Sequence, residues 1–188
     1  MKQVKPITIE LMKFPEDKQE IASWETEFGG KPEFDSIHKF ILEDQTYYGL
    51  DEVIETNYEI YPIGKNEQVL SLVAKEEERI IAWILLDVFD LQEERPQLFI
   101  PYICLHPLYQ NKGYGSEILK ELLLNPEKYF GAVPSYIFAK IDKNNIASQN
   151  LFKKFGFELT PITYTSFVSA HTETPRLITE KESSNLGE

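Results

Sequence analysis

Cysteine and histidine are scarce in this sequence. One residue of 188 is cysteine and three are histidines. A single thiol cannot form an intrachain disulfide, which excludes a disulfide-stabilised secreted scaffold. The three histidines, His38, His106 and His171, lie far apart in the sequence and form no short metal-binding motif. We therefore expect neither structural disulfides nor a bound metal ion.

Positive charge and long hydrophobic runs are also limited. The chain has 19 Lys and Arg against 31 Asp and Glu, a net charge of −12 at pH 7. Nucleic-acid binding requires a basic surface that neutralises phosphates, so this charge argues against it. The longest apolar run, residues 80–86, is far shorter than the roughly 20 residues of a membrane helix. The basic start, residues 1–6, is not followed by the hydrophobic segment of a signal peptide. We expect a cytoplasmic protein that binds neither nucleic acid nor membranes.

The chain is rich enough in apolar residues to fold around a core. Hydrophobic residues make up 42% of it and aromatic residues 13%, and its length is that of one domain. Hydrophobic periodicity predicts helices over residues 16–28, 33–45, 114–124 and 146–154. It predicts strands over residues 4–14, 68–74, 80–88, 97–105, 135–141, 157–159 and 163–168, whereas residues 55–63 fit a short strand or a loop. This order of elements indicates an α/β domain with a mixed sheet.

The strand predicted over residues 97–105 is almost wholly apolar, which is typical of a central strand. Pro101 stands in its middle and has no N–H group to donate to a neighbouring strand. We therefore expect that the strand is bulged at Pro101 or lacks a partner on one side.

A glycine-containing loop follows this strand and leads directly into a helix. Residues 105–115 read LHPLYQNKGYG. Glycine allows backbone N–H groups to approach a phosphate closely, and a helix N-terminus favours negative charge. A dinucleotide-binding motif would need a third glycine at Ile118, and a P-loop would need Gly-Lys followed by Ser or Thr. By itself, this loop is therefore either a tight turn or a phosphate site.

A second segment, residues 144–157, reads NNIASQNLFKKFGF. Together the two segments resemble the GNAT superfamily of N-acetyltransferases. The acetyl-CoA loop pattern of that family, Gln/Arg-x-x-Gly-x-Gly/Ala, is matched by Gln110, Gly113 and Gly115. The end of its next βα unit is matched by Leu151, Gly156 and Phe157, with Phe152 at the position where the family pattern has tyrosine. The specific match covers about residues 97–157, and the order of elements fits over about residues 4–168.

The resemblance implies a fold and a cofactor site. It implies one domain over residues 1–168, with a central mixed, mostly antiparallel sheet flanked by about four helices, and a polar tail over 169–188. A V-shaped cleft would hold acetyl-CoA as a cosubstrate, with no metal. The backbone of Ile103, Cys104 and Leu105 would bind the pantetheine arm, and one N–H group would polarise the thioester carbonyl. The residues implied around the pyrophosphate are Gln110, Asn111, Lys112, Gly113, Tyr114, Gly115 and Ser116, with Asn145 contacting the cofactor from the other side.

Two departures from the family leave the catalytic residues unassigned. Phe152 stands where many members have a tyrosine that protonates the leaving thiolate, and Lys140 stands where some have a glutamate base. An alkylammonium must lose a proton before it attacks, so a base elsewhere, a water, or an amine of low pKa is required. The resemblance implies an N-acetyltransferase in which a primary amine attacks directly. The alternative is a non-catalytic acetyl-CoA-binding module, and the charge disfavours a nucleic-acid-directed acetyltransferase.

Acidic residues are concentrated at the start of the chain. Residues 1–60 contain 14 Asp and Glu against 6 Lys and Arg, a balance of −8, whereas the remaining 128 residues carry −4. In the family, the first two helices and the loop after them form one wall of the site that binds the acceptor amine. Carboxylates there would attract a cationic small molecule or peptide amine, or they serve only solubility. A homodimer is the other partner that the sequence leaves open.

Three reactive side chains near the loop also have structural interpretations. We interpret Cys104 as a small core residue and not as a nucleophile. His106 is interpreted as a surface residue at the end of the strand and not as a base. Tyr114 is expected to pack beneath the loop rather than to donate a proton.

Overall fold

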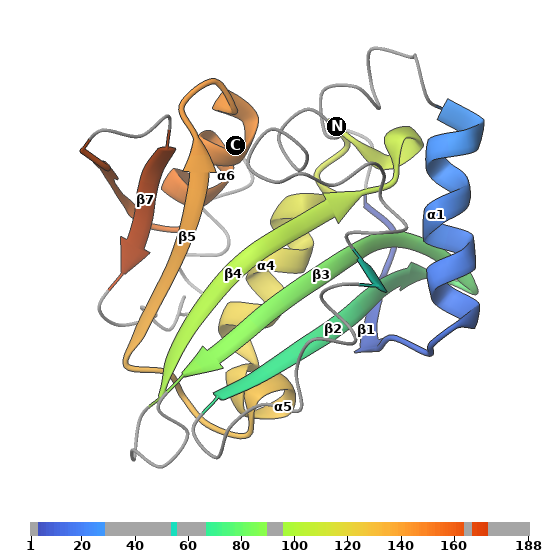
Figure 1. Ribbon diagram of the computed structural model, residues 1–188, viewed down its shortest axis with the longest axis horizontal. Coiled ribbons are helices and arrows are strands. Elements are labelled where there is room, and N and C mark those ends of the chain that lie inside the picture. Colours follow the sequence, from blue (N-terminus) through green and yellow to red (C-terminus); the bar gives the residue numbers. More distant parts are fainter. Residues whose placement is uncertain (1–3, 29–53, 56–66, 90–95, 164–166, 173–188) are drawn as a thin grey trace.

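The computed structural model describes residues 4–28, 54–55, 67–89, 96–163 and 167–172. They form a seven-stranded sheet in the spatial order β1-β2-β3-β4-β5-β7-β6 (Figure 1). The strands are β1 (Thr8–Leu11), β2 (Glu67–Glu76), β3 (Arg79–Phe89), β4 (Gln97–Leu105), β5 (Tyr136–Asp142), β6 (Glu158–Pro161) and β7 (Phe167–Thr172). The helices are α1 (Glu16–Phe28), the short 3-10 helix η1 (Pro107–Tyr109), α4 (Tyr114–Leu124), α5 (Pro126–Phe130) and α6 (Ile146–Lys154).

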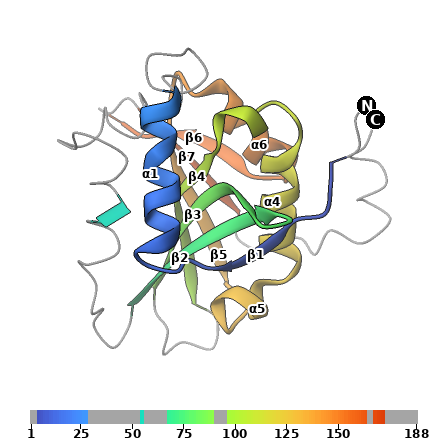
Figure 2. The same ribbon diagram turned by 90° about the vertical axis from the view of Figure 1, so that its right-hand side faces the viewer.

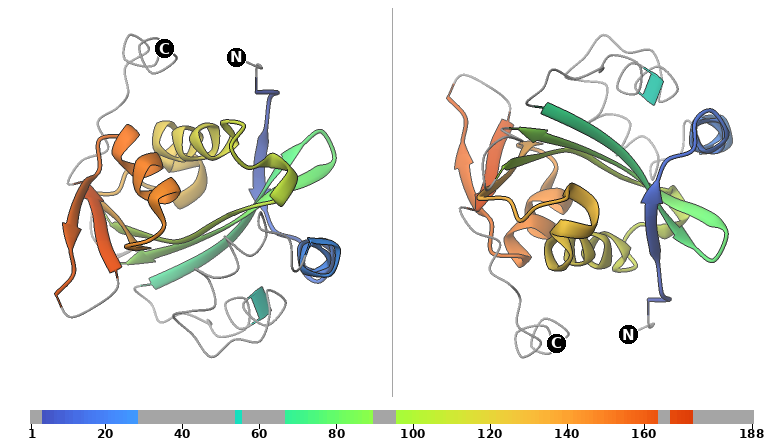
Figure 3. Two further views of the ribbon diagram at one scale, coloured as in Figure 1. Left: turned by 90° about the horizontal axis from the view of Figure 1, so that it is seen from above. Right: turned by 90° about the horizontal axis from the view of Figure 1, so that it is seen from below.

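All neighbouring strands are antiparallel except β4 and β5, which are parallel. The predicted α/β fold with a mixed, mostly antiparallel sheet and about four helices is therefore confirmed. In the described part of the chain, α4, α5 and α6 lie on one face of the sheet and α1 lies on the other (Figure 2 and Figure 3). No described helix has both the length and the apolar character that crossing a membrane requires.

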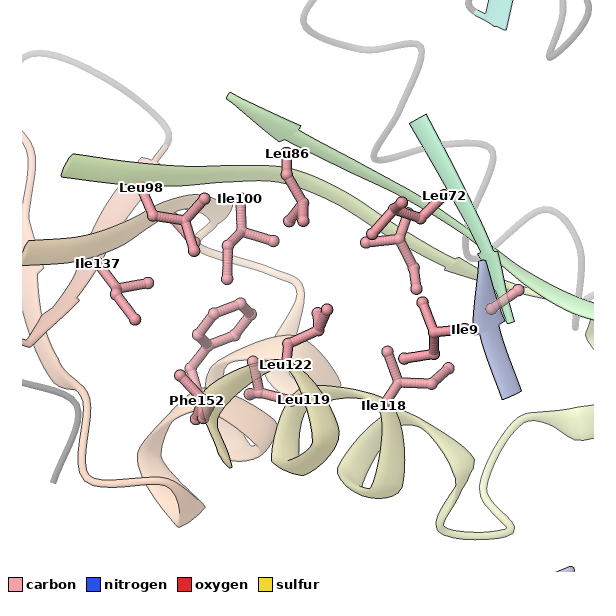
Figure 4. Packing of buried hydrophobic residues seen from close by; sticks show 14 of the residues in the cluster. Ile9, Leu72, Leu86, Leu98, Ile100, Ile118, Leu119, Leu122, Ile137 and Phe152 are labelled. Carbon is pink, nitrogen blue, oxygen red and sulfur yellow. The ribbon is translucent and has the colours of Figure 1, made fainter. Parts of the chain in front are cut away.

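One hydrophobic core fills the space between the sheet and the helices α4 and α6. The residues Ile118, Leu119 and Leu122 recur at helical spacing, so they form one apolar face of α4. Figure 4 shows Leu122 below Ile100 of the sheet and Ile118 beside Ile9 of β1. This packing holds the N-terminus of α4 in place beside β4.

A second core lies on the opposite face of the sheet, beneath α1. Ile21 and Trp24 of α1 pack against Trp83 of β3 and Cys104 of β4. Because cores cover both of its faces, β3 is buried at nearly every position and shows no simple alternation. The central strands are therefore held from both sides near the end of β4.

The observed elements differ from the predicted ones mainly at their ends. β4, α4 and α6 have the predicted bounds, whereas the first strand shrinks from residues 4–14 to Thr8–Leu11. The sequence predicts only a helix end at Pro126, yet α5 begins there, since proline is favourable in a first helical turn. The helix expected over residues 33–45 and the segment 56–63 lie outside the described residues.

The last strand, β7, runs past the expected start of the polar tail. Residues 169–172 pair with β5 and partly with β6, and Ala170 is fully buried. Its polar residues Ser169 and His171 alternate with Val168 and Ala170, so only every second position faces the core. Strand pairing therefore extends four residues beyond residue 168, and residues 173–188 lie outside the described part.

Candidate functional site

The strands β4 and β5 pair only at their first residues and then separate. The parallel pairing joins residues 97–99 of β4 to residues 136–138 of β5. β5 then continues beside β7 as far as Asp142, whereas β4 beyond Phe99 has no recorded partner on the β5 side in the described part of the chain. Figure 1 shows the two strands diverging toward their carboxyl ends. This divergence corresponds to the V-shaped opening that the sequence resemblance implies.

A bulge in β4 lies next to the point where the strands separate. Leu85 of β3 pairs with Tyr102, and Asp87 pairs with Phe99. Ile100 and Pro101 therefore stand opposite the single residue Leu86. The expectation of a bulge at Pro101 is confirmed, and so is the unpaired side of the strand.

The pairing of β4 with β3 decides which backbone groups of the strand face the opening. The N–H of His106 donates to the carbonyl oxygen of Ile81 on β3, at 2.8 Å. Because successive N–H groups of a strand point to opposite sides, those of Leu105 and Ile103 point away from β3, where β5 has diverged. The N–H of Cys104 points toward β3. Of the three predicted pantetheine-binding residues, Ile103 and Leu105 thus present backbone donors to the opening.

The loop after β4 enters α4 through two left-handed residues. Asn111 has a φ of 55° and Gly113 a φ of 93°. A Cβ atom at Gly113 would lie 3.0 Å from Cγ2 of Val4, closer than side chains usually pack. Gly113 also occupies the cap position and has no side chain to bind the first N–H groups of α4. These donors, on Tyr114 and Gly115, have no acceptor within the helix, an arrangement that suits an anion.

Gly115 brings three elements of the opening together. A Cβ atom added to it would lie 3.4 Å from Cδ1 of Leu105 on β4 and 3.5 Å from Cδ2 of Leu151 on α6. The N-terminus of α4 therefore lies directly against the end of β4 and against α6. An added Cβ atom would still be in ordinary van der Waals contact at these distances, so little space remains there for a side chain larger than alanine.

The other predicted loop residues lie around the same turn. The N–H of Gln110 donates to the carbonyl oxygen of Pro107 at 3.4 Å, and the N–H of Ser116 to that of Gly113 at 3.0 Å. Lys112 is exposed, and its ammonium lies 5.8 Å from the ring centroid of Tyr109. The loop thus carries one exposed cation beside the N-terminus of α4.

Asn145 lies on the β5 side of the opening, where the loop after β5 enters α6. Its Oδ1 accepts a hydrogen bond from the N–H of Ser148 at 3.1 Å, so the side chain caps α6. Helix capping is therefore a definite role of Asn145. The residue is half-buried, and its amide nitrogen has no acceptor among the described residues.

The two reactive groups at the end of β4 are buried. Burial raises the pKa of the Cys104 thiol to about 12, which confirms its interpretation as a core residue. The expectation of a surface position for His106 is wrong, because only 1% of this side chain is exposed. Its Nδ1 accepts from the N–H of Leu108 at 3.1 Å, and burial, with a smaller effect of Arg79, lowers its pKa to about 4. His106 is therefore neutral at physiological pH and caps η1.

The two positions that depart from the family differ in their surroundings. Phe152 is buried in the core on α6 and meets Phe157 edge-on, with ring centroids 5.0 Å apart (Figure 4). Lys140 is exposed on β5, on the face opposite to Ile137, Ala139 and Ile141. Neither side chain can act as the proton donor or acceptor that stands there in other members.

Sequence reasoning missed one carboxylate beside the bulge. Asp87 of β3 pairs with Phe99, and it lies on the α1 face of the sheet, since its neighbours Leu86 and Val88 face the α4 core. Its Oδ1 atom is buried. One acid within an otherwise apolar strand was the signal that could have revealed it. In the described residues, no group of three or more His, Cys, Asp or Glu side chains could hold a metal ion.

Comparison with known proteins connects this geometry to a family. A model of the acetyltransferase (GNAT) family matches residues 34–157. None of the curated proteins matches the chain significantly. Solved structures match its fold, and at their low sequence identities they show the fold alone.

Three of these structures illustrate the similarity. Spermidine N-acetyltransferase from Vibrio cholerae, in complex with CoA and spermine, is 14% identical with a TM-score of 0.62, over 92% of this chain and 98% of that chain. The ribosomal-protein-S18-alanine N-acetyltransferase from Escherichia coli is 14% identical with a TM-score of 0.53, over 88% and 91%. A GNAT family acetyltransferase from Elizabethkingia anophelis with acetyl-CoA bound is 17% identical with a TM-score of 0.54, over 89% and 97%. Because the family model matches more than half of the sequence, the chain belongs to the GNAT family of acetyltransferases.

Proposed function

We infer that the protein transfers the acetyl group of acetyl-CoA to a primary amine of a small cationic molecule or peptide. The observation that carries this proposal is the divergence of β4 and β5 beside the uncapped N-terminus of α4. One opening thereby combines backbone donors from a strand with an anion-binding helix end. These two features suit the two ends of a CoA molecule, the pantetheine arm and the pyrophosphate.

The backbone donors of β4 suit the thioester. As the amine attacks, negative charge develops on the carbonyl oxygen, and a preorganised N–H group stabilises that charge without reorganising. The N–H groups of Ile103 and Leu105 face the opening and are held by the pairing of β4 with β3. We assign the oxyanion-stabilising role to this pair.

Asp87 is our proposed proton acceptor. It lies on the α1 face of the sheet, beside the bulge where β4 and β5 separate. A carboxylate on this face can take the proton of an attacking ammonium through bound water, because Asp87 lies three residues along β3 from Ile84, the partner of Ile103. Asp87 would thereby supply, from another strand, the base that is missing at Lys140.

The proposal of a cationic acceptor amine is based on the acidic start of the chain and on aromatic rings near Asp87. The first 60 residues carry a balance of −8. On the α1 face next to Asp87, the ring of Phe99 stacks on Phe138 with centroids 4.9 Å apart, and Phe138 lies 6.4 Å from Phe89. Carboxylates and aromatic faces both attract cations. The fold neighbour from Vibrio cholerae, named as a spermidine N-acetyltransferase, is consistent with such an acceptor.

The second candidate is an acetyl-CoA-binding module without catalysis. The buried Phe152 and the exposed Lys140, which lack the usual acid and base, favour it. Release of the CoA thiol distinguishes the two functions. With acetyl-CoA and a panel of spermidine, a simple alkylamine and glutamate, a transferase releases thiol faster when a suitable amine is added. Tight CoA binding without amine-dependent thiol release would establish the module instead.

A further inference from the structure

The two tyrosines that flank the glycine loop bind the same carboxylate. Tyr109 ends η1 and Tyr114 begins α4, so residues 110–113 lie between them. The hydroxyl of Tyr114 donates to Oε1 of Glu76, and the hydroxyl of Tyr109 donates to Oε2 at 3.2 Å. The two rings meet edge-on with centroids 5.2 Å apart. One side chain at the end of β2 thus fixes both ends of a four-residue loop.

The surroundings of Glu76 keep its carboxylate ionised and in place. Its side chain is only 12% exposed, and the ammonium of Lys5 lies 4.0 Å from Oε2. The hydrogen bond from Tyr114 is the main cause that lowers the pKa of Glu76, and the same bond raises the pKa of Tyr114 to about 12. At neutral pH the carboxylate is therefore charged and both phenols keep their protons.

The loop between the tyrosines needs such support. It contains two left-handed residues, Asn111 and Gly113, and the non-glycine conformation at Asn111 is unfavourable by itself. A loop that orders only when a ligand binds loses affinity through the entropy of ordering. Anchoring both ends of the loop to β2 removes part of this cost before the ligand arrives.

We propose that Glu76 is a positioning residue for the pyrophosphate of the cofactor. It holds Tyr109 and Tyr114, and thereby the loop between them, without contacting the pyrophosphate itself. This inference rests on the proposed function, since that function places CoA at this loop. Glu76 carries a negative charge near an anion site, so its charge alone opposes binding. Removing it will therefore weaken CoA binding only if the loop loses its position.

The test uses Glu76→Gln, Tyr109→Phe and Tyr114→Phe in the full chain, with CoA and pantetheine as probes. Pantetheine carries the same arm but no pyrophosphate. Calorimetry gives the Kd for CoA, and ligand-observed NMR gives the Kd for pantetheine. We expect Glu76→Gln to raise the Kd for CoA about tenfold and to change the Kd for pantetheine less than about twofold. The double variant of Glu76→Gln with Tyr114→Phe should bind CoA no more weakly than the weaker single variant, because Tyr114→Phe removes an interaction that Glu76→Gln already disturbs.

Glu77→Gln is the matched control. Glu77 is the next residue along the hairpin, its side chain is 80% exposed, and it contacts Lys5 at 3.6 Å. The Glu77→Gln substitution removes the same charge without removing a contact to the loop. The Kd of this variant for CoA should therefore stay unchanged or fall slightly.

Two outcomes would overturn the positioning role while leaving the proposed function intact. One is an unchanged Kd for CoA in Glu76→Gln, and the other is an equal loss of affinity for CoA and pantetheine, which indicates a general structural defect. Failure of the wild-type protein to bind CoA would overturn the proposed function and the positioning role together.

Discussion

Trp24 of α1 meets the ring of His106 edge-on, with the ring centroids 5.0 Å apart. Tyr109 contacts the same imidazole ring at 5.5 Å. The three aromatic residues come from α1, the segment after β4 and the end of η1. Their contact joins the helix on one face of the sheet to the loop that leads into α4. It also buries the imidazole of His106 and lowers its pKa.

This burial makes stability depend on pH through His106. Between pH 6.5 and about 4, the unfolded chain protonates this histidine while the folded protein keeps it neutral. The free energy of unfolding should therefore decrease as the pH falls through this interval. His106→Asn cannot titrate, yet its side-chain oxygen can still cap η1. The Tm of this variant, though lower overall, should fall less steeply than the Tm of the wild type. Parallel curves in the two proteins would contradict the assignment.

Gly113 and Gly131 form a matched pair for testing the loop. Both have a positive φ, 93° and 73°, so alanine costs roughly 1–2 kcal/mol of strain at either position. Only at Gly113 would the new Cβ meet another residue, Val4, whereas Gly131 has nothing within 4 Å. We expect Gly113→Ala to weaken CoA binding tenfold or more, about 1.4 kcal/mol, and Gly131→Ala to leave it unchanged. Calorimetry measures the affinities and thermal unfolding measures the strain. Equal losses of affinity would rule out the loop as the CoA site.

Phe152 should be replaceable by tyrosine with little effect on the reaction. Its ring packs in the core against Phe157 and has no group that titrates. Phe152→Tyr should keep kcat within a few-fold of the wild type, or raise it where protonation of the thiolate limits the rate. The measurement is steady-state thiol release, with circular dichroism to check the fold. A loss above about a hundredfold, roughly 2.7 kcal/mol of barrier, would reveal a catalytic function of the ring.

Asp87→Asn tests the proposed proton acceptor. The variant keeps the shape of the side chain but cannot take a proton. We expect kcat/KM to fall on the order of 10²- to 10⁴-fold at neutral pH. Glu158→Gln, an exposed charge at the start of β6, serves as the control and should change the rate little. A kcat/KM in Asp87→Asn within a few-fold of the wild type would exclude Asp87 as the base.

The cationic acceptor can be tested by the effect of salt. Exposed carboxylates attract a cation through a field that is screened over about 8 Å at physiological salt. Spermidine should therefore be preferred over glutamate at low ionic strength, mainly through the second-order rate constant, and this preference should shrink as salt increases. Competition between the two acceptors at two ionic strengths measures it. A preference for glutamate, or a preference for spermidine that does not change with ionic strength, would contradict the cationic acceptor. The acidic residues within 1–60 would then serve solubility.

The elements that surround the opening could be predicted from the amino-acid sequence. The bounds of β4, α4 and α6 follow from local signals: an unbroken apolar run, apolar residues at helical spacing, and a proline or glycine at the ends. Pro101, which lacks an N–H group wherever it stands in the fold, indicated a bulge or an unpaired side, and β4 has both. The motif residues from Gln110 to Ser116 could likewise be assigned to a loop at a helix start, because their φ preferences are local.

The contacts between these elements, in contrast, depend on how distant segments pack together. Trp24 buries His106 from a distant part of the chain, and Glu76 receives two tyrosines that belong to another loop. The direction of the N–H groups of Ile103 and Leu105 depends on the register between β3 and β4, and so does the place of Asp87 beside the bulge. Burial, pKa and hydrogen-bond direction arise from packing between segments far apart in the sequence, and periodicity within one segment carries no information about them.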